Sequence, residues 1–100
     1  MSLTKDECCQ CIAECMVESL PDKWKTAWME AEVSEKEISA EYFYTSGFLN
    51  KQSKFKTDNV FAPMNAMKAI QEIMASEGQN WSKAKFFIKK DGTFEFTPIA

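Results

Sequence analysis

The first apolar pattern of the chain has the spacing of a helix. Apolar residues recur about every four positions from Cys8 to Met16, and the acidic residues between them fall on the opposite side. Thr4 stands three residues before Glu7, which is the spacing of a capping box at a helix N-terminus. We therefore predict an amphipathic helix over residues 4–19, with its acidic side in water.

The next two segments alternate between apolar and polar positions with a period of two, which is typical of half-buried strands. In residues 24–34, Trp28, Glu30 and Glu32 share one face, and in residues 37–45 the alternation continues. The apolar faces consist of Ala27, Met29, Ala31 and Val33 in the first segment, and of Ile38, Ala40, Tyr42 and Tyr44 in the second. We predict an acidic, aromatic-rich hairpin with a short turn at residues 34–36.

The second half of the chain begins with a polar segment, residues 46–58, in which we expect a third short strand at 53–56. Helical spacing returns over residues 60–77, where methionine and isoleucine line one side. Pro63 falls in the first turn of this predicted helix, where proline is tolerated, and Gly78 is a natural end for it.

The last strands flank Asp91-Gly92, a pair that favours a tight hairpin turn with both residues at positive φ. A closing hairpin over residues 83–97 follows. Taken together, the pattern predicts a single α+β domain over residues 1–100. It would be a two-layer fold with an antiparallel sheet of four to five strands and two helices, in the order α-β-β-(β)-α-β-β.

The amino-acid composition limits the functions that the chain could have. The chain of 100 residues is 45% hydrophobic, which is ample for one core, and no apolar run reaches the ~20 residues of a membrane span. The N-terminal segment has acidic residues where a signal peptide would have basic and then apolar ones, so we expect a cytoplasmic protein. The sequence has no histidine, and all 12 basic residues are lysines. We therefore expect no enzyme, no metal and no cofactor, because the commonest general base and metal ligand is missing.

The net charge of −3 hides an asymmetry between the two halves. Residues 1–50 hold ten acidic residues and four lysines, whereas residues 51–100 hold eight lysines and five acidic residues. The acidic half is either ordinary solvated surface or a face that meets a basic partner. Exposed glutamates on strands seldom have the raised pKa that acid–base catalysis needs, so a binding patch is the favoured functional interpretation.

All four cysteines lie within eight residues, at positions 8, 9, 11 and 15. Structural zinc sites usually join two distant pairs, and Cys9 points away from the other three on the predicted helix. A partial copper(I) site of a metal chaperone is one interpretation. The favoured one is that Cys8 and Cys9 are small core residues with Cys15 at the border.

The closing hairpin interleaves lysines with phenylalanines, an arrangement that resembles a stacking platform for single-stranded nucleic acid. The residues concerned are Lys83, Lys85, Phe86, Phe87, Lys89, Lys90, Phe94 and Phe96. Strand alternation sends half of these rings to the core, and the chain lacks arginine, the usual residue for bidentate phosphate contacts. Nucleic-acid binding is therefore the second hypothesis, behind binding to a protein.

Several ordered features resemble bacterial immunity proteins of the YezG type. Pro21-Asp-Lys-Trp24 leads into a strand that ends in Glu-Val-Ser34, and the aromatic strand Tyr42-Phe43-Tyr44 comes next. After a helix, Trp81 precedes the hairpin from Phe86 to Phe94. The cysteine cluster is not part of this pattern. The resemblance implies a protein without catalytic activity that binds the C-terminal domain of a secreted or contact-delivered toxin, often a nuclease, in the producing cell.

The first hairpin supplies the hypothesis for where such a toxin would bind. Its glutamates would attract a basic cleft, and Tyr42 and Tyr44 or else Phe43, whichever side faces outward, would anchor the complex. The residues proposed for this site are Glu30, Glu32, Glu37, Glu41, Tyr42, Phe43 and Tyr44. No nucleic acid and no membrane is expected as a partner.

Overall fold

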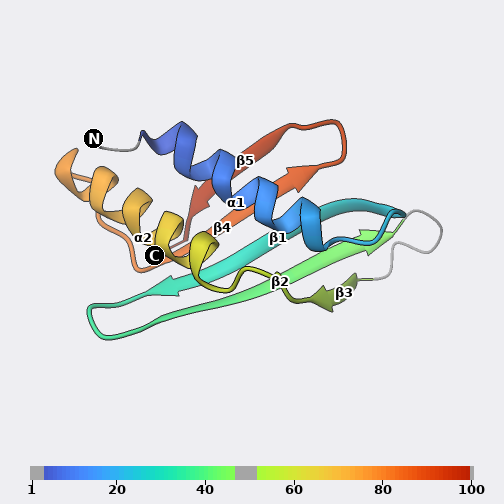
Figure 1. The fold of residues 1–100 in the computed structure, drawn as a ribbon. Coiled ribbons are helices and arrows are strands. Elements are labelled where there is room, and N and C mark those ends of the chain that lie inside the picture. Colours follow the sequence, from blue (N-terminus) through green and yellow to red (C-terminus); the bar gives the residue numbers. More distant parts are fainter. Residues whose placement is uncertain (1–3, 47–51, 100) are drawn as a thin grey trace.

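The computed structural model describes residues 4–46 and 52–99, which form two helices and five strands (Figure 1). In chain order they are α1 (Lys5–Ser19), β1 (Trp24–Val33), β2 (Ile38–Ser46), β3 (Gln52–Phe55), α2 (Phe61–Ser76), β4 (Lys83–Lys89) and β5 (Phe94–Pro98). The predicted α+β class and element order are confirmed, including the third strand. Within the polar segment 46–58, residues 47–51 lie outside the described residues.

Local hydrogen bonds explain where the helices begin and end. The Glu7 N–H donates to Thr4 Oγ1 at 3.1 Å, and the Thr4 N–H donates back to Glu7 Oε1 at 3.3 Å, which completes the predicted capping box. At the end of α2, Gly78 adopts φ +87°, a conformation that costs glycine little because it has no Cβ.

The five strands form one antiparallel sheet in the order β3-β2-β1-β4-β5. Sequence neighbours pair within each hairpin, and the two hairpins join where β1 pairs with β4. Glu30 lies opposite Glu41 on one side and Lys85 on the other. The sheet order therefore brings the acidic first hairpin directly against the lysine-rich last one.

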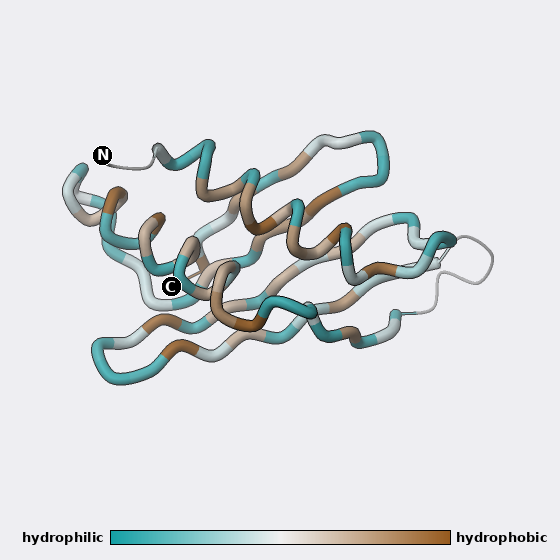
Figure 2. The backbone as a smooth tube through the Cα atoms, viewed as in Figure 1, coloured by the Kyte–Doolittle hydropathy of each residue, from teal (hydrophilic) through white to brown (hydrophobic). Residues whose placement is uncertain are grey.

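Both helices lie on the same face of the sheet, as Figure 1 shows. The core between these two layers takes alternate residues from every long strand and one side of each helix. Its fully buried side chains include Cys8, Cys9, Ile12, Met16, Met29, Val33, Met67, Ile70 and Phe86. In Figure 2 the hairpin turns are hydrophilic, whereas the chain around the start of α2 is hydrophobic. Among the described residues, neither helix is long and apolar enough to span a membrane.

The final hairpin has a longer connection than the two-residue turn predicted from Asp91-Gly92. The Gly92 N–H donates to the Lys89 carbonyl at 3.0 Å, and the Lys89 N–H donates to the Thr93 carbonyl at 2.9 Å. Gly92 has φ +96°, while Asp91 accepts hydrogen bonds from the N–H and Oγ1 of Thr93. A turn followed by a left-handed glycine is the usual alternative when a hairpin loop is longer than two residues.

Candidate functional site

The sheet face that points away from both helices carries the candidate site. Strand alternation places Trp28, Glu30 and Glu32 of β1 on this face, which we call the open face. The register adds Glu41 and Phe43 from β2, Lys54 from β3, Lys83, Lys85, Phe87 and Lys89 from β4, and Glu95 from β5. The flanking residues of the same strands point into the core, so the open face is built by the same segments that hold the fold together.

Three aromatic rings cross the centre of the open face in one row. Trp28 stands between Phe43 and Phe87, which are its partners in the two neighbouring strands. The ring centroids of Trp28 and Phe43 are 5.5 Å apart, and those of Trp28 and Phe87 are 6.3 Å apart, with nearly parallel planes in both pairs. Such contacts hold large apolar side chains in place at a surface. We call these three residues the aromatic row.

Lysines pack against the aromatic row. The Lys85 ammonium lies 5.2 Å from the ring centroid of Trp28 and 5.9 Å from that of Phe87, and the Lys54 ammonium lies 5.7 Å from that of Phe43. Cation–π contacts of this kind contribute about 0.5–1 kcal/mol at exposed positions. The lysine stems also cover part of the rings, which explains why Phe43 is only 7% exposed on a face without helices.

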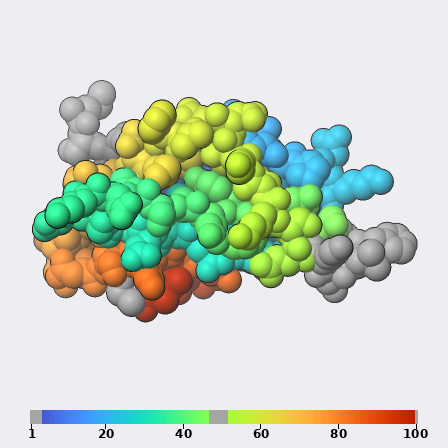
Figure 3. Space-filling model, turned by 90° about the horizontal axis from the view of Figure 1, so that it is seen from below, coloured from blue at the N-terminus to red at the C-terminus, as the bar shows by residue number. Residues whose placement is uncertain are grey.

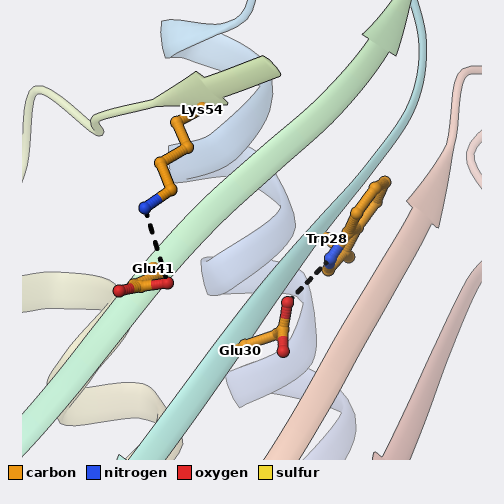
Figure 4. A network of polar contacts seen from close by, with 4 residues as sticks. All are labelled: Trp28, Glu30, Glu41 and Lys54. Carbon is orange, nitrogen blue, oxygen red and sulfur yellow. Dashed lines mark hydrogen bonds and ion pairs between the residues drawn. The ribbon is translucent and has the colours of Figure 1, made fainter. Parts of the chain in front are cut away.

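The charges of the open face balance. Four glutamates (positions 30, 32, 41 and 95) share it with four lysines (positions 54, 83, 85 and 89). Glu30 and Glu41 are direct cross-strand partners, which would be unfavourable alone. Figure 4 shows how each is engaged: the Trp28 Nε1–H donates to Glu30 at 3.1 Å, and Lys54 forms an ion pair with Glu41 at 3.9 Å. The first hairpin is therefore not an isolated acidic surface.

The residues proposed from the sequence separate into two groups. Glu30, Glu32, Glu41 and Phe43 come together on the open face. Glu37 lies in the β1–β2 turn, where its N–H donates to Ser34 Oγ. The two tyrosines belong to the helix-covered side, where both contact the ring of Phe55 from β3. Tyr42 is 8% exposed, and burial raises the pKa of its hydroxyl. Of the three candidate anchors, only Phe43 faces the open side.

Sequence reasoning did not include Trp28, Phe87 or Lys54 in the protein-binding site. The alternation of residues 24–34 puts Trp28 on the same face as Glu30 and Glu32, so Trp28 could have been assigned to the binding site from the sequence. Phe87 and Lys54 required the knowledge that β4 and β3 flank the first hairpin. Local sequence patterns do not specify that pairing.

The lysine–phenylalanine hairpin is divided between the two sides of the sheet. Lys83, Lys85, Phe87 and Lys89 are on the open face, whereas Phe86, Phe94 and Phe96 are on the helix-covered side. Lys90 lies in the turn and donates to the Asp22 carbonyl. Only one of the four phenylalanines in this hairpin is therefore available to a ligand on the open face.

The cysteines lie on the opposite side of the molecule, in α1. Cys8 and Cys9 are buried in the core and Cys15 is half-buried at its border, as the favoured interpretation predicted. Cys11 is also half-buried. Burial raises the pKa of the Cys9 thiol to about 11 and also raises the pKa values of Cys8 and Cys15. Raised pKa values oppose thiolate formation, which metal binding requires. Within residues 4–46 and 52–99, no three metal-ligating side chains are grouped closely enough to hold an ion.

Comparisons with known proteins add no family assignment. No protein-family model matches the chain, and no curated protein shows significant similarity to it.

Proposed function

We propose that this protein is an immunity protein, which binds the C-terminal domain of a secreted or contact-delivered toxin in the cytoplasm of the producing cell. It neutralises the toxin by covering its active site or another essential surface, and catalyses no reaction itself. Under the resemblance to YezG-type proteins, the expected target is a nuclease domain. The choice of the open face as the binding surface does not depend on this resemblance, because it rests on the structure alone.

The aromatic row is the observation that supports this proposal. Trp28 lies on the central strand of the sheet, with its ring centroid 5.5 Å from that of Phe43 and 6.3 Å from that of Phe87. It belongs to the face opposite the buried residues of β1. Binding energy at protein interfaces concentrates in a few central residues, and tryptophan is strongly enriched among them. The surrounding glutamates and lysines resemble the polar rim that normally encloses such a centre.

The balanced charges indicate how the surface would act. Four glutamates interleaved with four lysines produce little long-range field, so they would not steer a partner from a distance. They would instead fix the register of the bound partner through short-range complementarity.

Growth protection tests the function. A toxin domain, taken from the gene that neighbours the one for this protein, is expressed with the wild-type protein, with Trp28→Ala or with Phe94→Ala. Phe94 is a matched control because its ring is 45% exposed but lies on the helix-covered side. We expect protection by the wild type and Phe94→Ala, and its loss in Trp28→Ala at equal soluble protein. Cells that die despite abundant wild-type protein would contradict an immunity function.

A single-stranded nucleic acid is the second candidate, and the lysine contacts favour it. Lys85 and Lys54 lie over rings of the aromatic row, and proteins that bind single strands combine such rings with basic side chains. The equal number of glutamates on the same face opposes it. Titration with a labelled oligonucleotide distinguishes the two: we expect affinity no tighter than the non-specific range of ~10⁻⁴–10⁻⁶ M at physiological salt.

A further inference from the structure

One edge of the sheet is only half paired. β3 is a short edge strand, and its register pairs it with residues 42–45 of β2 alone. β2 begins at Ile38, so residues 38–41 have β1 on one side and no described strand on the other. Figure 3 looks onto this edge from below, where β2 (green) lies between the start of α2 (yellow) and the segment after β3 (yellow-green).

The hydrogen-bond pattern shows which backbone groups point outward. At the β1–β2 turn, the Ser34 N–H donates to the Glu37 carbonyl at 2.9 Å. Since bonding alternates along an antiparallel pair, odd-numbered residues of β2 face β1 and even-numbered residues face away. The N–H and C=O groups of Ile38 and Ala40 therefore point to the unpaired side. Within the described residues, no hydrogen bond is made to them there.

A cavity of about 480 Å³ opens beside this edge, and its polar walls come from Glu41, Lys54, Lys56 and Thr57. Its apolar walls come from Ala40 of β2, Phe55 of β3, and Val60 and Met64 at the start of α2. Its volume falls within the 300–1,000 Å³ typical of ligand pockets. Val60 is 55% exposed, and its neighbour Phe61 is 75% exposed. The chain around the start of α2 is hydrophobic in Figure 2.

We propose that an extended segment of a partner protein adds to the sheet as a short strand along residues 38–41. Its backbone would hydrogen-bond the outward N–H and C=O of Ala40, and the side chain opposite Ala40 would enter the cavity. Main-chain bonds provide affinity in this mode of recognition, and a pocket for alternate side chains provides specificity. The segment would thus alternate, with leucine-like residues toward the cavity and polar residues toward Ser39 and Glu41.

A second copy of the chain is a poor occupant. The open stretch is bounded by the end of β3 at Phe55 and by the turn at 34–37. Suppose that two copies paired antiparallel about Ala40. The β3 strand of each copy, which covers residues 42–45 of its own β2, would then collide with the β1–β2 turn of the other copy. A short segment avoids this clash. The inference rests on the β2 edge and not on the open face, so it does not depend on the toxin proposal.

A matched set of synthetic peptides tests the inference without altering the protein. The probe is the capped pentapeptide acetyl-Lys-Leu-Thr-Leu-Lys-amide, added to ¹⁵N-labelled protein. In the proposed pose the leucine N–H groups face β2 and the threonine N–H faces solvent. We expect shift changes at residues 38–41 and 60–64 at roughly millimolar peptide, because short flexible strands bind weakly. N-methylation of both leucines should weaken binding by about tenfold or more, and N-methylation of the threonine by less than about twofold.

A protein variant supplies the reciprocal test. Proline is tolerated in edge strands where the N–H faces solvent, so Ala40→Pro should retain the circular dichroism spectrum and lose binding by about tenfold or more. Hydrogen exchange of the free protein should be faster at the Ala40 amide than at the Tyr42 amide, which pairs with β3. The inference is overturned by an absence of shifts, by shifts confined to the open face, or by equal binding of the two N-methylated peptides.

Discussion

The two faces of the sheet use aromatic residues for different purposes. Phe86 and Phe87 are neighbours in β4, yet Phe86 is 0% exposed between the sheet and the helices, whereas Phe87 stands beside Trp28 on the open face. On the covered face, aromatic area is buried by folding. On the open face, the rings of the aromatic row are covered in part by one another and by lysine stems, and the proposed partner would bury the rest of their surface. Trp28 and Phe87 remain half-buried, and a cluster of partly exposed apolar side chains is typical of an interaction surface.

The comparison teaches that one strand can serve stability and recognition independently. Side chains point alternately to the two sides, so a change at an even-numbered residue of β4 affects the core, and a change at an odd-numbered residue affects the surface.

The largest expected effect comes from the core member of the adjacent phenylalanine pair. Phe86→Ala should lower the free energy of unfolding by about 3–5 kcal/mol, because a fully buried ring leaves a cavity. Phe87→Ala should cost about 1 kcal/mol, mainly through lost contact with Trp28 and Lys85. Urea unfolding of both variants measures the difference. Equal losses would show that the open face is part of the core.

A second effect follows from the buried thiols of the covered face. The pKa of Cys9 is about 11 in the folded protein against 9.0 in a free thiol, so above pH 9 the unfolded chain binds fewer protons than the folded one. The contribution of the neutral Cys9 thiol to the free energy of unfolding is therefore complete below pH 9, and it is lost as the pH rises to about 11. The expected loss is on the order of 2 kcal/mol.

Denaturant unfolding between pH 8 and 11 measures this slope, and Cys9→Ala is the control. The variant should lose stability less steeply, although the raised pKa values of Cys8 and Tyr42 leave a residual slope of the same sign. If the free energy of unfolding depends on pH in the same way in the wild type and the variant, the Cys9 thiol is in contact with water in the folded protein.

Much of this architecture was predictable because its causes are local. The capping box of Thr4 and Glu7 fixes the start of α1, and the alternation around Trp28 identifies the face of β1 that later proves to be open. The half-buried position of Cys15 also followed from helical spacing. These features depend on residues within one or two turns of the chain, which sequence patterns describe well.

The composition of the site was less predictable because it depends on distant pairings. Lys85 and Lys83 lie opposite Glu30 and Glu32 only because β4 pairs with β1. More than fifty residues separate these partners, and no local pattern specifies which strands become neighbours. The choice among Phe43 and its two tyrosine neighbours also required knowledge of which face the helices cover.

The half-buried cysteines should contribute little. Cys11→Ser combined with Cys15→Ser should change the free energy of unfolding by less than about 1 kcal/mol, since both thiols lie at the border of the core. Cys8→Ser combined with Cys9→Ser is the buried counterpart and should cost more, because hydroxyl groups would enter an apolar layer. Metal analysis of the purified protein should find no stoichiometric zinc or copper; an ion lost in the first double variant would contradict this.

The smallest effect is expected from the ion pair on the open face. Glu41 and Lys54 approach to 3.9 Å, but their side chains are 64% and 70% exposed, so solvent screens them. Glu41→Gln also removes repulsion with Glu30, and the two changes should offset each other to within about 0.5 kcal/mol. Thermal unfolding at low and high salt measures the change. A large, salt-dependent loss would mean that the charges of this face hold the fold together.

Calorimetric titration of the purified toxin domain into three proteins tests the central claim most directly. Trp28→Ala should raise Kd by about 30-fold or more, which corresponds to ~2 kcal/mol at a central contact residue, while Phe94→Ala should match the wild type. An unchanged Kd for Trp28→Ala, with a clear loss for Phe94→Ala, would place the interface on the helix-covered side and contradict the account.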